Sequence, residues 1–240
     1  MSDETRTQFE NLVLVACHAV YKADDFARPE DDASWQLEAF QKGEPPFYVG
    51  HARRGVELAA EDGAALLVFS GGQTRREAGP RSEAGGYFRL AEHFGWWGTS
   101  VAPRAATEEF ARDSFENLLF GLCRFYERAG RAPRRVTVVS WAFKQERFGL
   151  HRVALRFPES RFRFVGAGDP VDVNAAREAE RRNALEPFRR DPYGARPPLS
   201  EKREARDPFK RRPPYAATCP PLAPLLGHRG PRLFDGELPW

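Results

Sequence analysis

Three runs of consecutive apolar residues, rich in β-branched side chains, stand out along the chain. They are residues 12–16 (LVLVA), 65–69 (ALLVF) and 135–140 (RVTVVS). Continuous apolar runs of this length are typical of parallel strands that are buried on both faces. Residues 99–102 and 162–165 are weaker candidates for strands.

Stretches with a helical spacing of apolar residues separate these runs. Strands that alternate with helices of this length predict crossover units, and hence a mostly parallel central sheet with helices on both faces. The expected fold is therefore an α/β, Rossmann-like three-layer sandwich. The clearest of the predicted helices, residues 108–128, has a largely apolar face as far as Phe125, and Gly130 is a plausible stop signal just beyond it. The predicted helices are 47–62, 82–94, 108–128, 144–157 and 171–188.

The character of the chain changes beyond residue 189. Eleven of the twenty prolines fall within residues 190–240, and helical or strand periodicity disappears there. A disordered tail is one interpretation, but Phe209, Tyr215 and Trp240 are among more large apolar groups than a typical disordered segment carries. We therefore predict a Rossmann-like domain over residues 1–189 and a Pro-rich, irregular C-terminal arm, residues 190–240, that packs on it.

The predicted domain and the C-terminal arm also differ in their charge. The formal net charge of the chain is only +3, yet residues 189–212 hold nine Lys or Arg against four Asp or Glu. The chain therefore combines a basic arm with a near-neutral body. With 240 residues and 41% hydrophobic residues, it can bury a sizeable core.

Sequence signals for membrane insertion, secretion and metal binding are absent from the chain, and this bears on where the protein is expected to be found. The first apolar run is far shorter than the ~20 residues of a membrane span, and it lacks the basic flank of a signal peptide. The three cysteines are widely scattered, which favours reduced thiols over disulfides and gives no metal-site spacing. We therefore expect a cytoplasmic protein without a membrane partner or a metal.

The loops after the three strong strands are where a ligand is expected, because open parallel sheets bind ligands beyond the carboxyl ends of their strands. His18 comes after the first strand, where a neutral imidazole can act as acid, base or donor; a satisfied core histidine is the alternative. The second strand leads into Ser70, Gly71 and Gly72. Paired glycines favour an anion-binding nest of backbone amides, although a tight turn explains them equally well.

The third strand ends at Ser140 and leads to a pair of cations one helical turn apart, Lys144 and Arg147. These charges are placed to hold an anion; a solvated helix face is the alternative. No Gly-Lys-Ser/Thr comes after the glycine turn and the GxGxxG fingerprint is absent, which excludes ATP hydrolysis of the P-loop type. A nucleophilic serine is also poorly supported, since the chain has no GxSxG elbow.

Two further polar groups are candidates. Glu83 comes directly after a capping serine, in the first turn of a predicted helix, which by itself explains a carboxylate there. Glu108, Ser114 and Asn117 belong to one predicted helix, and the last two share a side of it. A buried amide at Asn117 would need partners, so a site is as reasonable as a solvent-facing group.

Taken together, these segments resemble a known family. The chain is similar in order and spacing to the YdcF-like and SanA-like proteins, the domain of unknown function 218, over residues 12–166. Its eukaryotic, fungal-type branch also resembles residues 35–41 and 192–240. The stretches that carry the resemblance are Val-Ala-Cys-His-Ala (15–19), Phe-Ser-Gly-Gly (69–72), Ser-Glu-Ala (82–84), residues 108–117 and residues 139–148.

The resemblance implies a Rossmann-like fold, a single pocket, and S-adenosylmethionine or another nucleotide as candidate ligands. Two departures matter, since many bacterial members have His where this chain has Lys144 and Asn where it has Asp113. A mechanism that relies on that histidine therefore does not carry over. The pocket implied by the resemblance contains Ser70, Gly71, Gly72, Glu83, Glu108, Ser114, Asn117 and Arg147.

Our first functional hypothesis is an enzyme or binding protein for a small anionic or nucleotide-like molecule. The glycine amides and Arg147 would hold the anion, while Glu83, Glu108 and His18 would supply acid–base catalysis; Ser70, Ser114, Asn117, Ser140 and Lys144 would complete the ligand site. The alternatives are an RNA-binding protein or a scaffold that acts through the basic arm. Three acidic residues, Glu201, Glu204 and Asp207, dilute the charge of that arm and disfavour nucleic acid.

Overall fold

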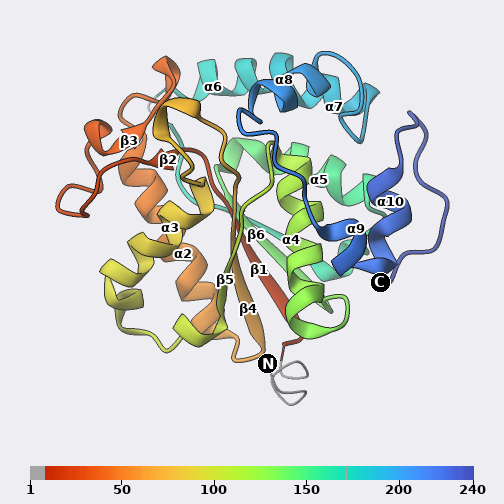
Figure 1. The fold of residues 1–240 in the computed structure, drawn as a ribbon, viewed down its shortest axis with the longest axis horizontal. Coiled ribbons are helices and arrows are strands. Elements are labelled where there is room, and N and C mark those ends of the chain that lie inside the picture. Colours follow the sequence, from red (N-terminus) through yellow and green to blue (C-terminus); the bar gives the residue numbers. More distant parts are fainter. Residues whose placement is uncertain (1–8, 171) are drawn as a thin grey trace.

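A five-stranded, wholly parallel sheet runs through the middle of the molecule (Figure 1). The computed structural model describes residues 9–170 and 172–240. The strand order is β5-β4-β1-β6-β7, so the chain starts in the centre, builds outward to β5, and then crosses over to β6 and β7. The strands are β1 (Asn11–Ala16), β4 (Ala65–Ser70), β5 (Ala105–Glu108), β6 (Arg135–Ser140) and β7 (Phe162–Gly166).

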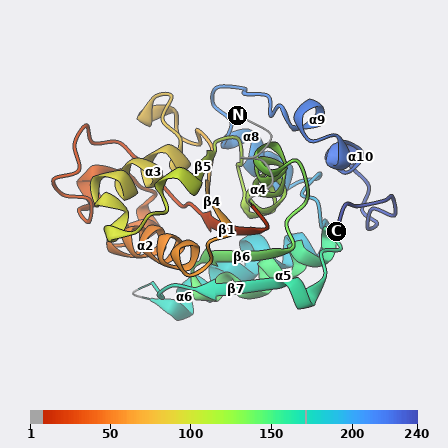
Figure 2. The ribbon, with the colours of Figure 1, turned by 90° about the horizontal axis from the view of Figure 1, so that it is seen from below.

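Helices cover both faces of the sheet, which confirms the α/β Rossmann-like sandwich. Figure 2 shows α2 and α3 on one side of the sheet and α4 on the other. Each face has its own core of buried side chains, because every residue of β1 and β4 is buried and successive residues point to opposite faces. The helices between and after the strands include α2 (Pro45–Glu61), α3 (Glu83–His93), α4 (Ser114–Ala129) and α5 (Gln145–Ala154).

Two boundaries differ most from the sequence-based prediction. The strand between α3 and α4 is Ala105–Glu108 rather than residues 99–102, and α4 begins at Ser114 rather than at Glu108. The strand lies at the edge of the sheet and consists of Ala-Ala-Thr-Glu, so it has no apolar run to reveal it. The side chain of Asp113 accepts a hydrogen bond from the amide of Glu116 and thereby starts the helix.

A short antiparallel ribbon and an interrupted helix were not predicted either. Strands β2 (Val20–Tyr21) and β3 (Trp35–Gln36) are too short to show a pattern. In place of the last predicted helix, the structure has three consecutive segments. They are α6 (Val173–Glu180), a π-helical segment at Arg181–Leu185, and α7 (Glu186–Arg190). Residues 1–8 and 171, which the predicted domain and helix include, lie outside the described residues.

The C-terminal arm is folded against the body. Three of its side chains, Leu199, Tyr215 and Leu222, are buried in the same core as α4, and the ring of Tyr215 lies 5.0 Å from that of Phe120. The indole of Trp240 donates to the carbonyl of Leu155 at 3.0 Å. The arm contains short helices, α8 (Leu199–Ala205), α9 (Tyr215–Thr218) and α10 (Ala223–Gly227), where the sequence shows no periodicity.

Helix α8 connects the arm to one end of the sheet. Together with α6, it lies across the carboxyl ends of the strands, at the top of Figure 1.

In the described part of the chain, no helix combines the length and the apolar character needed to cross a membrane.

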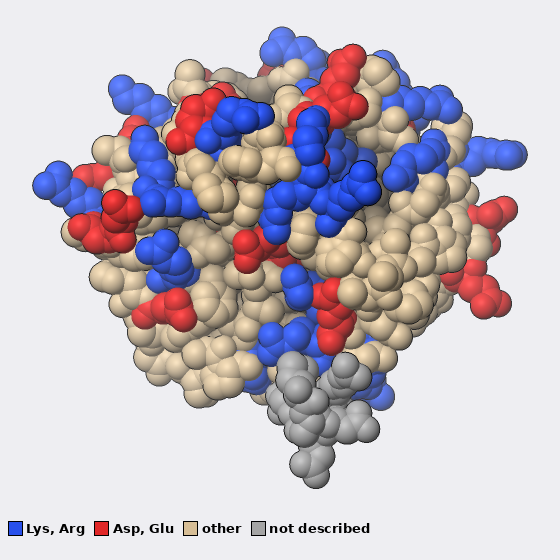
Figure 3. Space-filling view, in the orientation of Figure 1, with Lys and Arg blue, Asp and Glu red and all other residues tan. Residues whose placement is uncertain are grey.

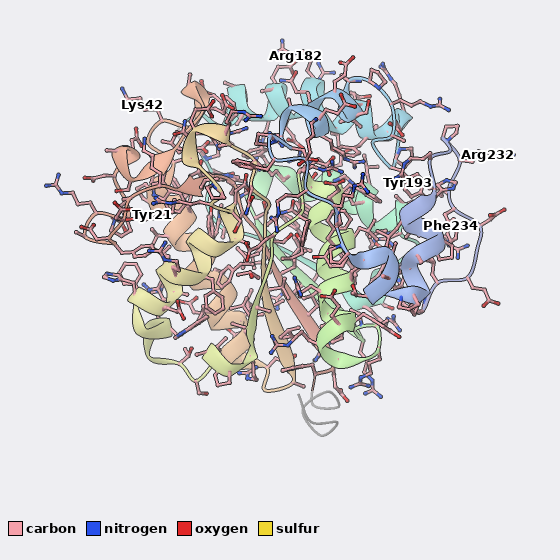
Figure 4. All side chains as sticks on the ribbon, in the orientation of Figure 1. Tyr21, Lys42, Arg182, Tyr193, Arg232 and Phe234 are labelled. Carbon is pink, nitrogen blue, oxygen red and sulfur yellow. The ribbon has the colours of Figure 1, made fainter. Side chains whose placement is uncertain are left out.

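A hydroxyl group that joins the arm to the body gives a test of this packing. Tyr193, labelled in Figure 4, donates to the carbonyl of Ala154 at 2.9 Å and accepts from the amide of Phe234 at 2.8 Å. We expect Tyr193→Phe to lower the free energy of unfolding by about 1–3 kcal/mol, because a buried carbonyl group and a partly buried amide lose their partner. Urea denaturation measures this change.

The matched control is Tyr126→Phe. The hydroxyl of this half-buried tyrosine of α4 has no hydrogen-bond partner among residues 9–170 and 172–240, so we expect a change below about 0.5 kcal/mol. Equal effects of the two substitutions would contradict the role of the Tyr193 hydroxyl.

Candidate functional site

A cavity of about 790 Å³ opens at the carboxyl ends of β1 and β6. The crossover direction of the chain reverses between these two strands, and ligands of open α/β sheets bind at such a point. Its walls come from the loops after β1 and β6, from the first turns of α4 and α5, and from α6 and α8. Segments from residue 16 to residue 206 therefore meet around one hollow.

The cavity gathers seven of the eleven residues that the sequence singled out. The glycine turn and Glu108 are the exceptions, together with Ser70, and none of these four lines the cavity. The seven lining residues are His18, Glu83, Ser114, Asn117, Ser140, Lys144 and Arg147.

The glycine turn is not an anion nest, so that interpretation is wrong. The amide of Gly71 donates to the carbonyl of Glu108 at 3.0 Å, and the amide of Gly72 donates to the carbonyl of Ala111 at 2.7 Å. Both amides are therefore occupied by the protein itself. Glycine is required here by close contacts, since a Cβ atom on Gly72 would lie 2.7 Å from the Ala111 carbonyl oxygen.

Glu108 lies behind the cavity wall, where it forms a buried junction. Its carboxylate accepts hydrogen bonds from the hydroxyls of Ser70 at 2.7 Å and Tyr215 at 2.9 Å, and from the amide of Phe110 at 2.8 Å. Burial raises the pKa of this carboxyl to about 7. The predicted acid–base role on a ligand has no access route, and Glu108 instead joins β4, the loop before α4, and the arm.

Glu83 is the acid that reaches the cavity. It lies at the start of α3 and accepts a hydrogen bond from the Thr74 hydroxyl at 2.5 Å. Burial raises the pKa of Glu83. The expected meeting of two carboxylates in one crevice is therefore not found, because only one of the pair lines it.

His18, Lys144 and Ser140 form a chain of contacts in the cavity wall. The Lys144 Nζ atom lies 3.2 Å from His18 Nδ1, and His18 Nε2 lies 3.4 Å from Ser140 Oγ. An ammonium group can only donate, so the Nδ1 atom accepts and the imidazole proton resides on Nε2. Burial, and then the charge of Lys144, hold the pKa of His18 well below its usual value.

This arrangement has the outline of a Ser-His-acid triad but the opposite electrostatics. In such a triad a carboxylate stabilises the imidazolium that forms when histidine takes the serine proton. Here a cation occupies the third position and destabilises the imidazolium. His18 is therefore a neutral donor that can orient a ligand, and Ser140 is not activated as a nucleophile.

Ser114 has a partner that the sequence did not indicate. Its hydroxyl lies 2.7 Å from Nε2 of His151, a fully buried side chain surrounded by the rings of Phe115, Phe148 and Phe188. Asn117 is also fixed, because its amide donates to the Ser70 carbonyl at 2.8 Å. The polar side of α4 is thus held rigidly toward the cavity.

Arg147 and Lys144 are joined by cations of the arm, which the sequence had connected only with RNA binding or scaffolding. Lys202 and Arg206 also line the cavity, and their spacing of four residues on α8 and its C-terminal end was the signal that could have placed them together. Arg147 Nε lies 2.9 Å from Glu180 Oε1. Burial lowers the pKa of Arg206, and it lowers that of Lys144 to about 7, with Arg147 as the next cause.

In residues 9–170 and 172–240, no group of three His, Cys, Asp or Glu is placed to hold a metal ion.

The raised pKa of Glu108 predicts a specific dependence of stability on pH. The folded protein keeps a proton that the unfolded chain releases above its usual pKa of 4.5. The free energy of unfolding therefore falls as pH rises from 4.5 to about 7, by roughly 3 kcal/mol for this group. In Glu108→Gln this contribution is absent, so the difference between the wild-type and variant unfolding free energies should change by that amount over this interval.

Urea denaturation of both proteins at several pH values measures the difference. Because other groups titrate equally in the two proteins, they cancel. Parallel pH profiles would show that Glu108 does not carry the shifted pKa.

Comparison with known proteins gives one informative similarity. The chain is 28% identical to an uncharacterised protein of Saccharomyces cerevisiae, and the aligned region covers 85% of this chain and 86% of the yeast protein. No family model matches the chain, and no solved structure matches it. The resemblance to YdcF-like proteins therefore stays a prediction, and the cavity has to be interpreted from its own chemistry.

Proposed function

We propose that the cavity binds a small anionic or nucleotide-like ligand and that the protein catalyses proton-transfer or group-transfer chemistry on it. The main support is the concentration of cations around one hollow. Lys144, Arg147, Lys202 and Arg206 all face it, and Figure 3 shows Lys and Arg gathered over the segment that joins α8 to α9.

These cations destabilise one another. After burial, the charges of Arg206 and Arg147 are what lower the pKa of Lys202, and Arg147 also lowers that of Lys144. Part of this charge is compensated, by Glu180 through Arg147 and by the other acidic residues that line the cavity, Glu44, Glu83, Asp113 and Asp172. A phosphate or carboxylate in the cavity would relieve the remaining repulsion and would form charge-assisted hydrogen bonds with the guanidinium groups.

Aromatic side chains favour a ligand that also has a flat ring. Trp141, Phe143 and Phe188 line the cavity. Phe40 stands at its rim with 76% of its surface exposed, an unusual position for a phenyl ring. Stacking of a nucleobase on such rings stabilises binding by about 1–3 kcal/mol per base.

The charge of the cavity discriminates between the two ligands that the family resemblance suggests. S-adenosylmethionine carries a sulfonium cation, which the cluster around Arg147 and Arg206 would repel. A phosphorylated nucleotide brings the opposite charge and fits these residues better. We therefore favour a phosphorylated or carboxylated ligand over S-adenosylmethionine.

Catalysis is supported by two groups whose protonation equilibria are shifted toward neutral pH. The pKa of Lys144 lies at about 7 and that of Glu83 is raised, both through burial. A group whose pKa lies near the working pH is an effective general acid or base, and Lys144 meets this condition. A cytoplasmic location is part of this proposal, in keeping with three free, buried cysteines.

The contacts of the arm favour this proposal over RNA binding or scaffolding. Arg203 binds Asp113 at 2.5 Å, and Arg211 donates to the Glu109 carbonyl at 2.6 Å. Tyr215, one of the aromatic groups that the RNA hypothesis would need, is fully buried. The arm uses its charges to dock on the body and to complete the cavity.

The proposal predicts stabilisation by phosphorylated compounds. At 100 times its dissociation constant, a ligand such as pyrophosphate or ADP should raise the free energy of unfolding by about 2.7 kcal/mol. We expect Arg206→Gln to weaken binding at least tenfold, because a guanidinium group that faces the anion is lost. Isothermal titration calorimetry and thermal unfolding with both ligands measure this.

Arg232→Gln is the matched control, since Arg232 is exposed on the distant part of the arm (Figure 4). Its affinity should equal that of the wild type. The proposal fails if no phosphorylated compound stabilises the wild type, or if the two variants bind equally.

A further inference from the structure

Lysine is scarce in this chain and is concentrated at the cavity. The chain has 37 Lys and Arg residues, of which only five are lysines: Lys22, Lys42, Lys144, Lys202 and Lys210. Three of the five, Lys42, Lys144 and Lys202, line the cavity. Arginine supplies positive charge as well as lysine does, but only lysine can lose its proton and become a nucleophile. The cavity therefore concentrates the side chain whose distinguishing property is a reactive amine.

Lys144 is the one of the three that lies inside the wall. Lys42 and Lys202 are exposed, whereas Lys144 is partly buried at the start of α5. Its Nζ atom lies 3.2 Å from His18 Nδ1 and 5.7 Å from the centre of the Phe143 ring. An amine held against a neutral imidazole has a proton acceptor within reach.

We infer that Lys144 forms an imine with the carbonyl group of an aldehyde or ketone whose anionic group is held by Arg147 and Arg206. The inference rests on the proposed function, because the same cavity has to hold the anion. An oxo acid, in which a carbonyl lies close to a carboxylate, has the required chemistry.

The step is balanced without any further reactant. The neutral amine of Lys144 attacks the carbonyl carbon, a C–N bond forms, and the carbonyl oxygen takes up the proton that the nitrogen loses, with His18 placed to relay it. The hydroxyl of this adduct then accepts one proton from the solvent and leaves as water, and the nitrogen lone pair forms the C=N bond. The products are one protonated imine and one water.

The surroundings of Lys144 favour the neutral amine. Burial and the charges of Arg147 and Arg206 lower its pKa to about 7, while Glu180 and Glu44 act in the opposite direction. A lysine pKa of about 7 leaves half of the amine unprotonated at neutral pH, against less than a hundredth for an ordinary lysine with a pKa near 10.4. The charged and titratable groups that face Lys144 are His18 after β1, Glu44 before α2, Arg147 on α5, Glu180 on α6 and Arg206 after α8.

Reductive trapping tests the inference on the whole protein. The wild-type chain is incubated with pyruvate and sodium cyanoborohydride, which reduces an imine to a stable secondary amine, and the modified lysine is located by peptide mass spectrometry. We expect modification of Lys144 at least tenfold faster than that of Lys22, and a rate that rises with pH through about 7, because the amine is released from its proton there. Acetone, a neutral ketone, should react at least tenfold more slowly at Lys144.

Variants test which amine forms the adduct. Lys144→Arg keeps the positive charge and removes the amine, so it should lose the trapped adduct. Lys22→Gln, at an exposed position outside the cavity, should leave the adduct on Lys144 unchanged.

Adducts that are spread evenly over the five lysines, or equal rates with pyruvate and acetone, would overturn the inference. Neither result would affect the measured binding of pyrophosphate, which tests the proposed function alone. Because the position of the adduct is measured on the wild type, the test does not depend on the folding of any variant.

Discussion

One buried carboxyl group, that of Glu108, connects the parts of the molecule on which the cavity depends. It receives hydrogen bonds from Ser70 at the end of β4, from the backbone that leads into α4, and from Tyr215 of the arm. Burial of a carboxylate is costly unless each of its oxygen atoms is satisfied. The network therefore fixes three segments relative to one another, and it does so directly behind the wall that carries Ser114 and Asn117.

The chemistry of the cavity arises from partial burial of many like charges. Water and counterions would screen Lys144, Arg147 and Arg206 on an open surface. In the hollow, burial and then the repulsion between these charges lower the pKa of Lys144 and hold the pKa of His18 well below its usual value. The same feature thus accounts for the expected affinity for anions, the unusual electrostatics of the His18 contacts, and the nucleophilic character that we infer for Lys144.

Sequence patterns predicted the central strands well and one of the two edge strands, β5, badly. Strands β1, β4 and β6 are enclosed by helices and therefore consist of apolar runs, whereas β5 has only one neighbouring strand and its four residues show no such run. A cavity does lie at the strand ends, the position at which the topology of an open parallel sheet leads us to expect a ligand. The occupied amides of Gly71 and Gly72 could not be foreseen, because their partners, the carbonyls of Glu108 and Ala111, become neighbours only in the folded chain. Arg206 was missed for a similar reason, since docking of the arm brings it to the cavity.

The π-helical segment between α6 and α7 has a geometric consequence for the cavity wall. A π-helical turn adds one residue to a helix, and one residue corresponds to a rotation of about 100°. Glu180, which contacts Arg147, and Phe188, which packs on His151, are eight residues apart and would differ by a rotation of about 80° on a regular α-helix. The residue added by the π-helical turn brings both side chains onto the side of the helix that faces the cavity. The orientation of Glu180 and Phe188 therefore depends on the number of residues between them as well as on which residues they are.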